Sequence, residues 1–449
     1  MNSIFSEDTI AAISTPIAAG GIGMVRVSGP KALEVTDRVF RSVSEKKVQQ
    51  TGGYSGLFGR VHDEQGDFDE AVVFVYRAPK SYTGEDVAEI CCHGGVYLVQ
   101  RTLRACIAAG ARPAQAGEFT RRAFVNGKMS LTQAEAVMDL IASQGQQSAQ
   151  AALQAKDGAV YKQIHAVVDR MLSISSALAA WVDYPDEDID EVSDENLRAG
   201  IDEICAGLHA ILSGYDNGKI LREGVSTVIV GRPNVGKSTL MNLLSGQEKS
   251  IVTQIPGTTR DIVEDTIRLG DLVLNLADTA GLRDTDDPVE KVGVELARKR
   301  LDTSYLVLAV FDSSQELSEE DWQLLDTLQG RPAVAVINKS DLARRVDVEA
   351  IRQKISHVAE ISAGTGEGVS ELEAQVRDLL NLSHLDSSSQ VIANERQRDC
   401  VAQASRTMDQ AQWALAEGQT LDAINVCIDA AIDSLLELTG ERASDAVID

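Results

Sequence analysis

The feature that most constrains the fold is the segment GRPNVGKS, residues 231–238, which follows the apolar run STVIV. Its G-x-x-x-x-G-K-S spacing, between an expected strand and an expected helix, is typical of a phosphate-binding loop. Gly231 and Gly236 allow backbone N–H groups to curl around phosphate oxygens, and the start of the helix adds its dipole. Lys237 supplies positive charge for the β- and γ-phosphates, and Ser238 supplies a hydroxyl for Mg²⁺. The segment therefore predicts a strand–loop–helix unit that binds a nucleotide.

Two later motifs match the loops that sense a γ-phosphate. GTTR, residues 257–260, offers Thr259 as a second Mg²⁺ ligand. DTAG, residues 278–281, offers Asp278 to hold the metal through water and the Gly281 N–H to reach the γ-phosphate. Leu282 follows directly, where many signalling GTPases place a glutamine that orients the attacking water. Hydrolysis by this chain therefore requires another group to position the water.

The segment NKSD, residues 338–341, indicates that the base is guanine. Asp341 can accept both hydrogens of the guanine N1–H and exocyclic amine. Adenine lacks that donor pair and would leave the carboxylate unpaired, at a cost of about 1–3 kcal/mol. Asn338 and Lys339 are expected to brace the loop and cover the base, and the backbone of ISAG, residues 361–364, to meet the guanine oxygen.

Motifs of this kind in this order predict a GTPase domain that binds GTP and GDP with Mg²⁺. The expected GTP-binding residues are Asn234, Val235, Gly236, Lys237, Ser238, Thr239, Thr253, Gln254, Ile255, Pro256, Gly257, Thr258, Thr259, Asp278, Thr279, Ala280, Gly281, Asn338, Lys339, Asp341, Ser362, Ala363 and Gly364.

The pattern of apolar runs, turns and helical spacing changes along the chain and predicts a multidomain protein of α/β and α+β class. Residues 1–120 alternate short apolar runs and turns around one helical stretch, VYLVQRTLRACIAAG, which favours an α+β domain. Residues 121–218 and 383–449 are rich in Ala, Gln and Leu at helical spacing, and we expect them to form one discontinuous helical domain. Residues 219–382 alternate strands and helices, as in an inserted P-loop domain with a doubly wound, mostly parallel sheet.

Composition limits the partners and the compartment. The formal charge of −26 gives no bulk attraction for nucleic acid, although positive and negative side chains balance in residues 1–128. No basic start followed by an apolar run marks a signal peptide, and no apolar stretch approaches the length of a membrane span. The six cysteines contain no C-x-x-C pair. We therefore expect a cytoplasmic protein in a reducing environment, with no membrane partner.

Three further stretches resemble one family closely. They are DTIAAISTPIAAGGIGMVRVSGP near the start, SYTGED with CHGG within residues 81–95, and AGEFTRRAFVNGKMSLTQAEAVMDLI at 116–141. With the GTPase block between helical segments, they identify a member of the MnmE (TrmE) family of tRNA-modification GTPases. The likeness covers nearly the whole chain.

The resemblance implies a cofactor and partners. Family members are homodimers through the N-terminal domain, which binds 5-formyl-tetrahydrofolate or a related folate. They act with an FAD-binding MnmG (GidA)-like protein on C5 of the wobble uridine of certain tRNAs. The folate-contacting positions fall on Arg26, Glu89 and Lys128 of this sequence. Glu89 suits pterin N–H donors, and the two cations suit anionic or carbonyl groups.

The resemblance also implies how hydrolysis proceeds without a glutamine. The family activates it with K⁺ when two GTPase domains meet across the dimer. The potassium ligands correspond to Asn234, Thr253, Ile255 and Thr258. A fixed cation can stabilise developing phosphate charge. The family's water-positioning glutamate corresponds to Glu290, which we expect to be the catalytic residue because a carboxylate accepts hydrogen bonds.

The resemblance ends before the last residues. The family ordinarily finishes in Cys-x-Gly-Lys, whereas this sequence reads LLELTGERASDAVID. We expect GTP hydrolysis not to need that motif. Either the sequence is truncated, or the tRNA chemistry takes a different course in this chain. The alternative function is a GTP-regulated scaffold that binds RNA or ribosomes and transfers no carbon. The SYTGED and GEFTRRAF stretches favour the modifying enzyme.

Overall fold

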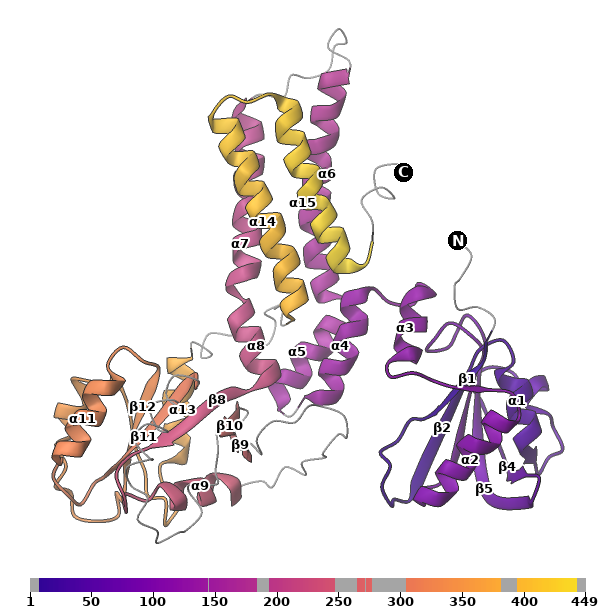
Figure 1. The fold of residues 1–449 in the computed structure, drawn as a ribbon, viewed down its shortest axis with the longest axis horizontal. Helices are drawn as coiled ribbons and strands as arrows, with labels where there is room; N and C mark the ends of the chain where they lie inside the picture. Colours follow the sequence, from indigo (N-terminus) through magenta and orange to yellow (C-terminus); the bar gives the residue numbers. More distant parts are fainter. Residues whose placement is uncertain are drawn as a thin grey trace. The chain divides into compact units, whose positions relative to one another are not determined.

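A computed structural model describes residues 8–143, 145–183, 194–246, 265–270, 272–276, 304–380 and 394–441. The chain divides into two compact units, Met1–Met138 and Asp139–Asp449. Figure 1 shows the first unit in indigo and purple, and the second in magenta, orange and yellow. Each unit contains one of the two sheets. None of the helices within the described ranges is long and apolar enough to cross a membrane.

The N-terminal unit is built on a seven-stranded sheet in the order β3-β4-β5-β6-β2-β1-β7. The strands are β1 (Ile10–Ile13), β2 (Ile22–Ser28), β3 (Phe40–Ser42), β4 (Ser55–Asp63), β5 (Gly66–Tyr76), β6 (Val87–His93) and β7 (Arg112–Pro113). The helices are α1 (Ala32–Val39), the 3₁₀ turn η1 (Val48–Gln50), α2 (Val96–Ala108) and α3 (Glu118–Val125). The expected α+β class is confirmed, with α1 and α3 in addition to the one helix that the sequence indicated. Both are eight residues long, which gives only a short periodic signal.

The period of two along the strands decides which face of this sheet is buried. Val25 and Val27 of β2 and Val73 of β5 are buried in one core with Val99 and Cys106 of α2. Arg26 lies between the two valines and therefore points to the opposite face. Because Arg26 pairs with Glu89 in the antiparallel register of β2 and β6, these two expected ligands are direct cross-strand neighbours.

The second sheet is six-stranded, in the order β13-β12-β11-β8-β10-β9. Its elements are β8 (Val225–Val230), α9 (Lys237–Gly246), β9 (Asp265–Leu269), β10 (Leu272–Leu276), β11 (Leu306–Asp312), α11 (Glu319–Leu328), β12 (Ala333–Asn338), α12 (Val348–Arg352), β13 (His357–Glu360) and α13 (Val369–Leu379). All neighbouring strands are parallel except β9 and β10. Every residue of β11 and β12 is buried, as expected for strands covered on both faces. The expected doubly wound, mostly parallel sheet is confirmed.

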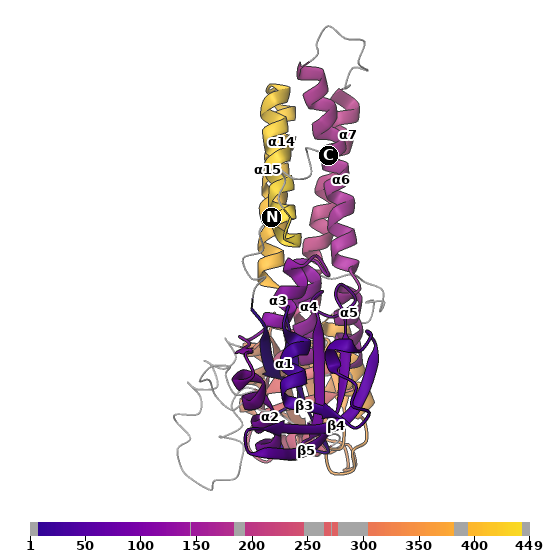
Figure 2. The same ribbon diagram turned by 90° about the vertical axis from the view of Figure 1, so that its right-hand side faces the viewer.

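The helical part consists of α4 (Leu131–Ala142), α5 (Gln146–Lys156), α6 (Ala159–Asp183), α7 (Asp194–Ser213), α8 (Tyr215–Glu223), α14 (Glu395–Ala416) and α15 (Leu421–Thr439). Figure 1 and Figure 2 both show α6 and α7 running alongside α14 and α15. One core unites them, with Ile164 and Met171 of α6, Leu208 of α7, Met408 of α14 and Leu435 of α15. Helices that precede the nucleotide motifs thus share a core with helices that follow them.

One expected helical stretch is divided. The periodic segment 131–154 forms two helices, because α4 ends at Ala142 and α5 begins at Gln146. The Ser143 hydroxyl donates to the Leu140 carbonyl, and the Gly145 N–H donates to the Ser148 hydroxyl. Local side-chain hydrogen bonds of serine compete with the helical ladder in this way.

Candidate nucleotide site and N-terminal ligand site

The phosphate loop connects β8 to α9, and its glycines stand where a larger residue would collide. Gly231 and Gly236 have φ of +149° and +100°. A Cβ on Gly231 would lie 2.4 Å from the Val310 carbonyl oxygen, and one on Gly236 would lie 2.2 Å from Asn338 Nδ2. Asn234 also has a left-handed backbone, with φ of +64°. The loop is therefore a strained turn that only this pattern of glycines accommodates.

Lys237 is held inside this loop. Its Nζ donates to the carbonyl oxygens of Gly231 and Arg232 at 2.8 and 2.9 Å. Burial lowers the pKa of Lys237 from its ordinary value. The ammonium group is thus fixed by the backbone that would surround phosphate oxygens, at the N-terminus of α9.

The guanine loop, residues 338–341, is joined by hydrogen bonds to the phosphate loop, residues 231–238. Asn338 Nδ2 donates to the Val235 carbonyl at 2.8 Å, and Asn338 Oδ1 accepts from the Ala363 N–H at 2.9 Å. Lys339 Nζ donates to the Asn234 carbonyl at 2.8 Å. The three motifs meet because the carboxyl ends of the parallel strands β8 and β12 lie at the same edge of the sheet.

Asp341, the expected guanine-reading carboxylate, is oriented by the third motif. The Ser362 hydroxyl donates to Asp341 Oδ1 at 2.7 Å. The structure thus brings together these residues from three separate motifs: Asn234, Val235, Gly236, Lys237, Asn338, Lys339, Asp341, Ser362 and Ala363. Ser238, Thr239 and Gly364 are the next residues of the same segments.

The remaining predicted GTP and metal residues lie outside the described residues. They are Thr253, Gln254, Ile255, Pro256, Gly257, Thr258, Thr259, Asp278, Thr279, Ala280 and Gly281, together with Leu282 and Glu290. Of the expected Mg²⁺ ligands only Ser238 is described, and of the expected K⁺ ligands only Asn234. A hydroxyl oxygen at the start of α9 and an amide oxygen in the loop are both hard donors, as these cations prefer.

Sequence reasoning missed Asp312, the last residue of β11. It is buried, and its Oδ2 accepts from Lys339 Nζ at 2.6 Å. Its position supplied a signal, because a charged residue at the end of an otherwise apolar parallel strand lies at the edge where ligands bind.

In the N-terminal unit, Arg26 and Glu89 form an ion pair on the sheet face opposite the core. Arg26 Nε and its terminal nitrogen donate to Glu89 Oε1 at 2.9 and 2.8 Å. The Tyr76 hydroxyl lies 3.4 Å from Glu89 Oε2, and burial together with the Glu89 charge raises the pKa of Tyr76. The guanidinium carbon of Arg26 is 5.3 Å from the ring centroid of Tyr82 and 5.5 Å from that of Phe119. Aromatic rings at this distance attract the cation and limit its movement.

Lys128, the third expected folate residue, is joined to the loop that carries Tyr82. Its Nζ donates to the Pro79 carbonyl at 3.0 Å, and Asn126 Nδ2 donates to the Thr83 carbonyl at 2.7 Å. The Tyr82 hydroxyl in turn shares a hydrogen bond of 2.8 Å with Thr120 in α3. The SYTGED loop and the GEFTRRAFVNGK segment therefore form one structure beside Arg26. Tyr76, Tyr82 and Phe119 are further candidate ligand-contacting residues. Only Tyr82 and Phe119 had a signal in the sequence, because they lie in the SYTGED and GEFTRRAFVNGK stretches that resemble the family.

An ionic network centred on the buried side chains of Glu118 and Arg122 anchors this structure. Glu118 receives hydrogen bonds from Arg112 at 2.7 Å and Arg122 at 3.2 Å, and Arg122 also pairs with Asp8 and Glu85. The Arg112 hydrogen bond holds the pKa of Glu118 at about 2, although burial opposes this shift. The network ties α3 to β7 and to the SYTGED loop.

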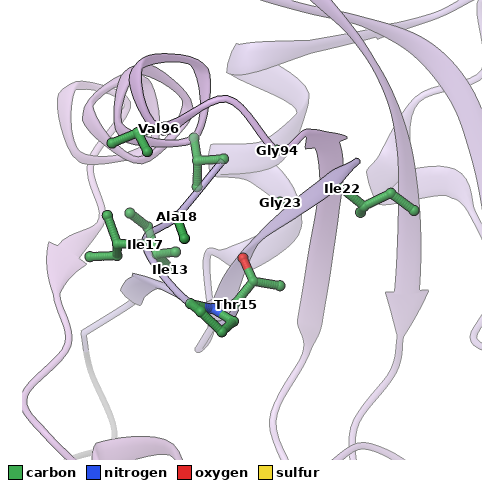
Figure 3. A pocket seen from close by; sticks show the side chains of 10 residues that line it. Ile13, Thr15, Ile17, Ala18, Ile22, Gly23, Gly94 and Val96 are labelled. Carbon is green, nitrogen blue, oxygen red and sulfur yellow. The ribbon is translucent and has the colours of Figure 1, made fainter. Parts of the chain in front are cut away.

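A small pocket lies at another place in the N-terminal unit. Figure 3 shows it between the segment with Thr15, Ile17 and Ala18 and the start of α2 at Val96. Its volume is about 10 Å³, which suffices for about one water molecule. A pterin does not fit there, so this pocket is not the candidate folate site.

The fold and the first of these sites define a P-loop nucleotide-binding protein with a guanine-type specificity loop. Comparison with known proteins narrows this class. Residues 9–128 match the family described as GTP-binding protein TrmE N-terminus, and residues 131–449 match the MnmE helical domain. The chain belongs to the MnmE family.

Three curated relatives extend over nearly the full length, each described as tRNA modification GTPase MnmE. That of Clostridioides difficile is 37% identical over 99% of this chain and 98% of its own length. That of Natranaerobius thermophilus is 40% identical over 99% of this chain and 98% of its own. That of Carboxydothermus hydrogenoformans is 39% identical over 98% of this chain and 97% of its own. The family resemblance inferred from the sequence is confirmed.

Proposed function

We propose that this chain is a GTPase that acts in tRNA modification. The observation that carries the proposal is the guanine loop, in which Asn338 and Lys339 are fastened to the phosphate loop and Asp341 is oriented by Ser362. A carboxylate held at this edge can pair with two donors of guanine and none of the corresponding edge of adenine. The family membership supports tRNA as the target of the modification.

Arg26, Glu89 and Lys128 hold a tetrahydrofolate that supplies the one-carbon unit. The ion pair of Arg26 and Glu89 offers an acceptor and a donor side by side, which suits the polar edge of a pterin. When bound, the folate supplies the carbon that is added at C5 of the wobble uridine. The chain acts as a homodimer with an FAD-binding MnmG-like protein, in the cytoplasm. The domain limits are those expected from the sequence: 1–120, 121–218 with 383–449, and 219–382.

Ser238 and Thr259 bind Mg²⁺, while Asn234, Thr253, Ile255 and Thr258 bind K⁺, which supplies positive charge when two GTPase domains meet. Glu290 accepts a hydrogen bond from the attacking water and orients it, which replaces the glutamine absent at Leu282. The fixed left-handed backbone of Asn234 supports this role, because it predefines the position of one K⁺ ligand.

The test of the central proposal is replacement of Asp341 by Asn in the full chain. We expect the wild type to prefer GTP to ATP and Asp341→Asn to lose at least tenfold of that preference, because an amide cannot accept from both guanine donors. In a strain that lacks this protein, mass spectrometry of tRNA nucleosides should show an unmodified wobble uridine that the wild type restores. Equal binding of ATP and GTP rejects the GTPase assignment. Unchanged tRNA in the deletion strain leaves the GTP-regulated scaffold.

The potassium step has its own test. GTP hydrolysis should be faster in K⁺ than in Na⁺ at equal ionic strength, and Glu290→Ala should slow turnover by about 10²–10⁴-fold without loss of GTP binding. Equal rates in the two salts would remove K⁺ from the proposal.

A further inference from the structure

Asp312 is a buried carboxylate in the nucleotide-binding domain whose role no motif assigns. Its side chain is 1% exposed. Oδ1 accepts from the Ser314 N–H at 2.9 Å and from the Ser314 hydroxyl at 2.7 Å, and Oδ2 accepts from Lys339 Nζ at 2.6 Å. Burial alone would raise the pKa of Asp312, but the hydrogen bonds from Lys339 and Ser314 outweigh it and keep the pKa below its ordinary value. Asp312 is therefore a charged, fixed acceptor.

The partner of Asp312 connects the two loops of the nucleotide site. Lys339 Nζ donates both to Asp312 and to the Asn234 carbonyl. Lys339 and Asn234 each have a left-handed backbone, with φ of +63° and +64°. Such conformations persist only where surrounding contacts impose them. The ammonium group of Lys339 is the contact that the two strained residues share.

The position of Asp312 follows from the sheet. Asp312 and Asn338 are register partners at the ends of the parallel strands β11 and β12. Asn338, the first residue of the guanine loop, and Asp312, which accepts the hydrogen bond of Lys339, therefore lie side by side where the two strands end. The Ser313 N–H donates to the Asn338 carbonyl at 2.8 Å, which adds a backbone link between the same two strand ends.

The Lys339 side chain is 32% exposed, so it has water as an alternative partner. Without Asp312, the ammonium group could leave the Asn234 carbonyl and remain solvated, because lysine has a long stem with many rotamers. The aliphatic stem would then no longer be held along the guanine loop.

We propose that Asp312 is a positioning residue that holds Lys339 against the Asn234 carbonyl and so couples the guanine loop to the phosphate loop. This inference rests on the proposed function as a GTPase. It extends that function by assigning retention of both GDP and GTP to a buried residue that acts through Lys339. The guanine preference itself stays with Asp341.

The test measures the dissociation rates of fluorescent GDP and GTP analogues from the full chain. We expect Asp312→Ala to raise both rates by about tenfold, equivalent to about 1.4 kcal/mol, and Asp312→Asn to raise them less. The preference for GTP over ATP should not change. Asp326→Asn is the matched control, because it breaks an exposed ion pair with Lys354 in the same domain.

A double-mutant cycle separates positioning from general destabilisation. If Asp312 acts through Lys339, then Asp312→Ala should add no further increase in a Lys339→Ala background. Additive effects in the two backgrounds, or unchanged dissociation rates in Asp312→Ala, would overturn the inference. Failure of the wild type to bind either guanine nucleotide would instead overturn the proposed function.

Discussion

At the scale of single residues, backbone strain in the second unit gathers at the nucleotide site. Asn234, Gly236 and Lys339 all have positive φ, and each is within one residue of a hydrogen bond between the phosphate loop and the guanine loop. Strained backbone of this kind costs on the order of 1–3 kcal/mol for each non-glycine residue. The cross-loop hydrogen bonds offset that cost and predefine the site before a ligand binds.

Gly236→Ala tests this arrangement. Its φ of +100° disfavours alanine, and the new Cβ would lie 2.2 Å from Asn338 Nδ2. We expect GDP affinity to fall at least tenfold in equilibrium binding, while the sheet remains folded by circular dichroism. Gly246→Ala, at the last residue of α9 and with nothing within 4 Å of the new Cβ, serves as the control. Normal GDP affinity in Gly236→Ala would contradict the coupling of the two loops.

At the scale of elements, a glycine in β2 allows α2 to pack closely on the core face of the N-terminal sheet. Gly23 allows α2 to approach so closely that a Cβ there would lie 2.2 Å from Val99 Cγ2. Val99 is buried and stiff at χ1, so it cannot move aside at low cost. This close approach packs α2 on the core face of β2, opposite to the face that carries Arg26.

Gly23→Ala should therefore destabilise the N-terminal unit by about 1–3 kcal/mol through overpacking. The cost should be smaller in a Val99→Ala background, because the added methyl then occupies vacated space. Urea titrations followed by the methyl NMR signals of Val25 and Val27 report on this unit. Equal costs in both backgrounds would show that Val99 is not the obstacle.

At the scale of the whole chain, each compact unit is closed by contacts between distant segments. In the N-terminal unit, Arg122 joins Asp8 and Glu85, and Glu118 joins Arg112 to Arg122. In the second unit, α6 and α7 share their core with α14 and α15. The pairs of Arg122 with Asp8 and Glu85, and the packing of α6 and α7 against α14 and α15, join residues far apart in the sequence, so loss of one segment exposes the rest of its unit.

The ionic network predicts acid sensitivity of the N-terminal unit. The folded pKa of Glu118 is about 2 against an ordinary value of 4.5, so its contribution to stability is complete above about pH 4.5. That contribution is lost as the pH falls from 4.5 towards 2, because the unfolded chain then binds the proton more tightly. Glu118→Gln should lower the free energy of unfolding at pH 7 by about 1.5–3 kcal/mol.

Urea titrations at pH 7 and pH 3, followed by the methyl signals of Val73 and Val75, measure this effect. The difference between wild type and Glu118→Gln should be smaller at pH 3 than at pH 7. Glu34→Gln, which removes an exposed ion pair with Arg38, should show little change at either pH. A constant difference across pH would mean that the charge of Glu118 is not what stabilises the unit.

More of the nucleotide site than of the N-terminal ligand site could be predicted from the residues themselves. The described part of the phosphate and guanine loops lies where the motifs predicted, because each motif is a contiguous turn whose residues must be neighbours. Arg26 and Glu89 are separated by 63 residues; their assignment to one ligand site came from family resemblance, and their ion pair was not predicted. The short helices α1 and α3 and the break between α4 and α5 were missed, because two turns or a single serine pair change periodicity very little.

The amino-acid sequence by itself determined the fold class and the phosphate loop, because periodicity and local turn chemistry act between near neighbours. It also predicts the specificity for guanine. Only the tertiary structure decided which distant groups meet: Asp312 with Lys339, Arg26 with the rings of Tyr82 and Phe119, and Arg122 with Asp8 and Glu85. These contacts depend on strand order and register, and neither follows from local preference. The nucleotide-binding motifs can therefore be recognised in the sequence, whereas the residues that hold them in place are found only in the structure.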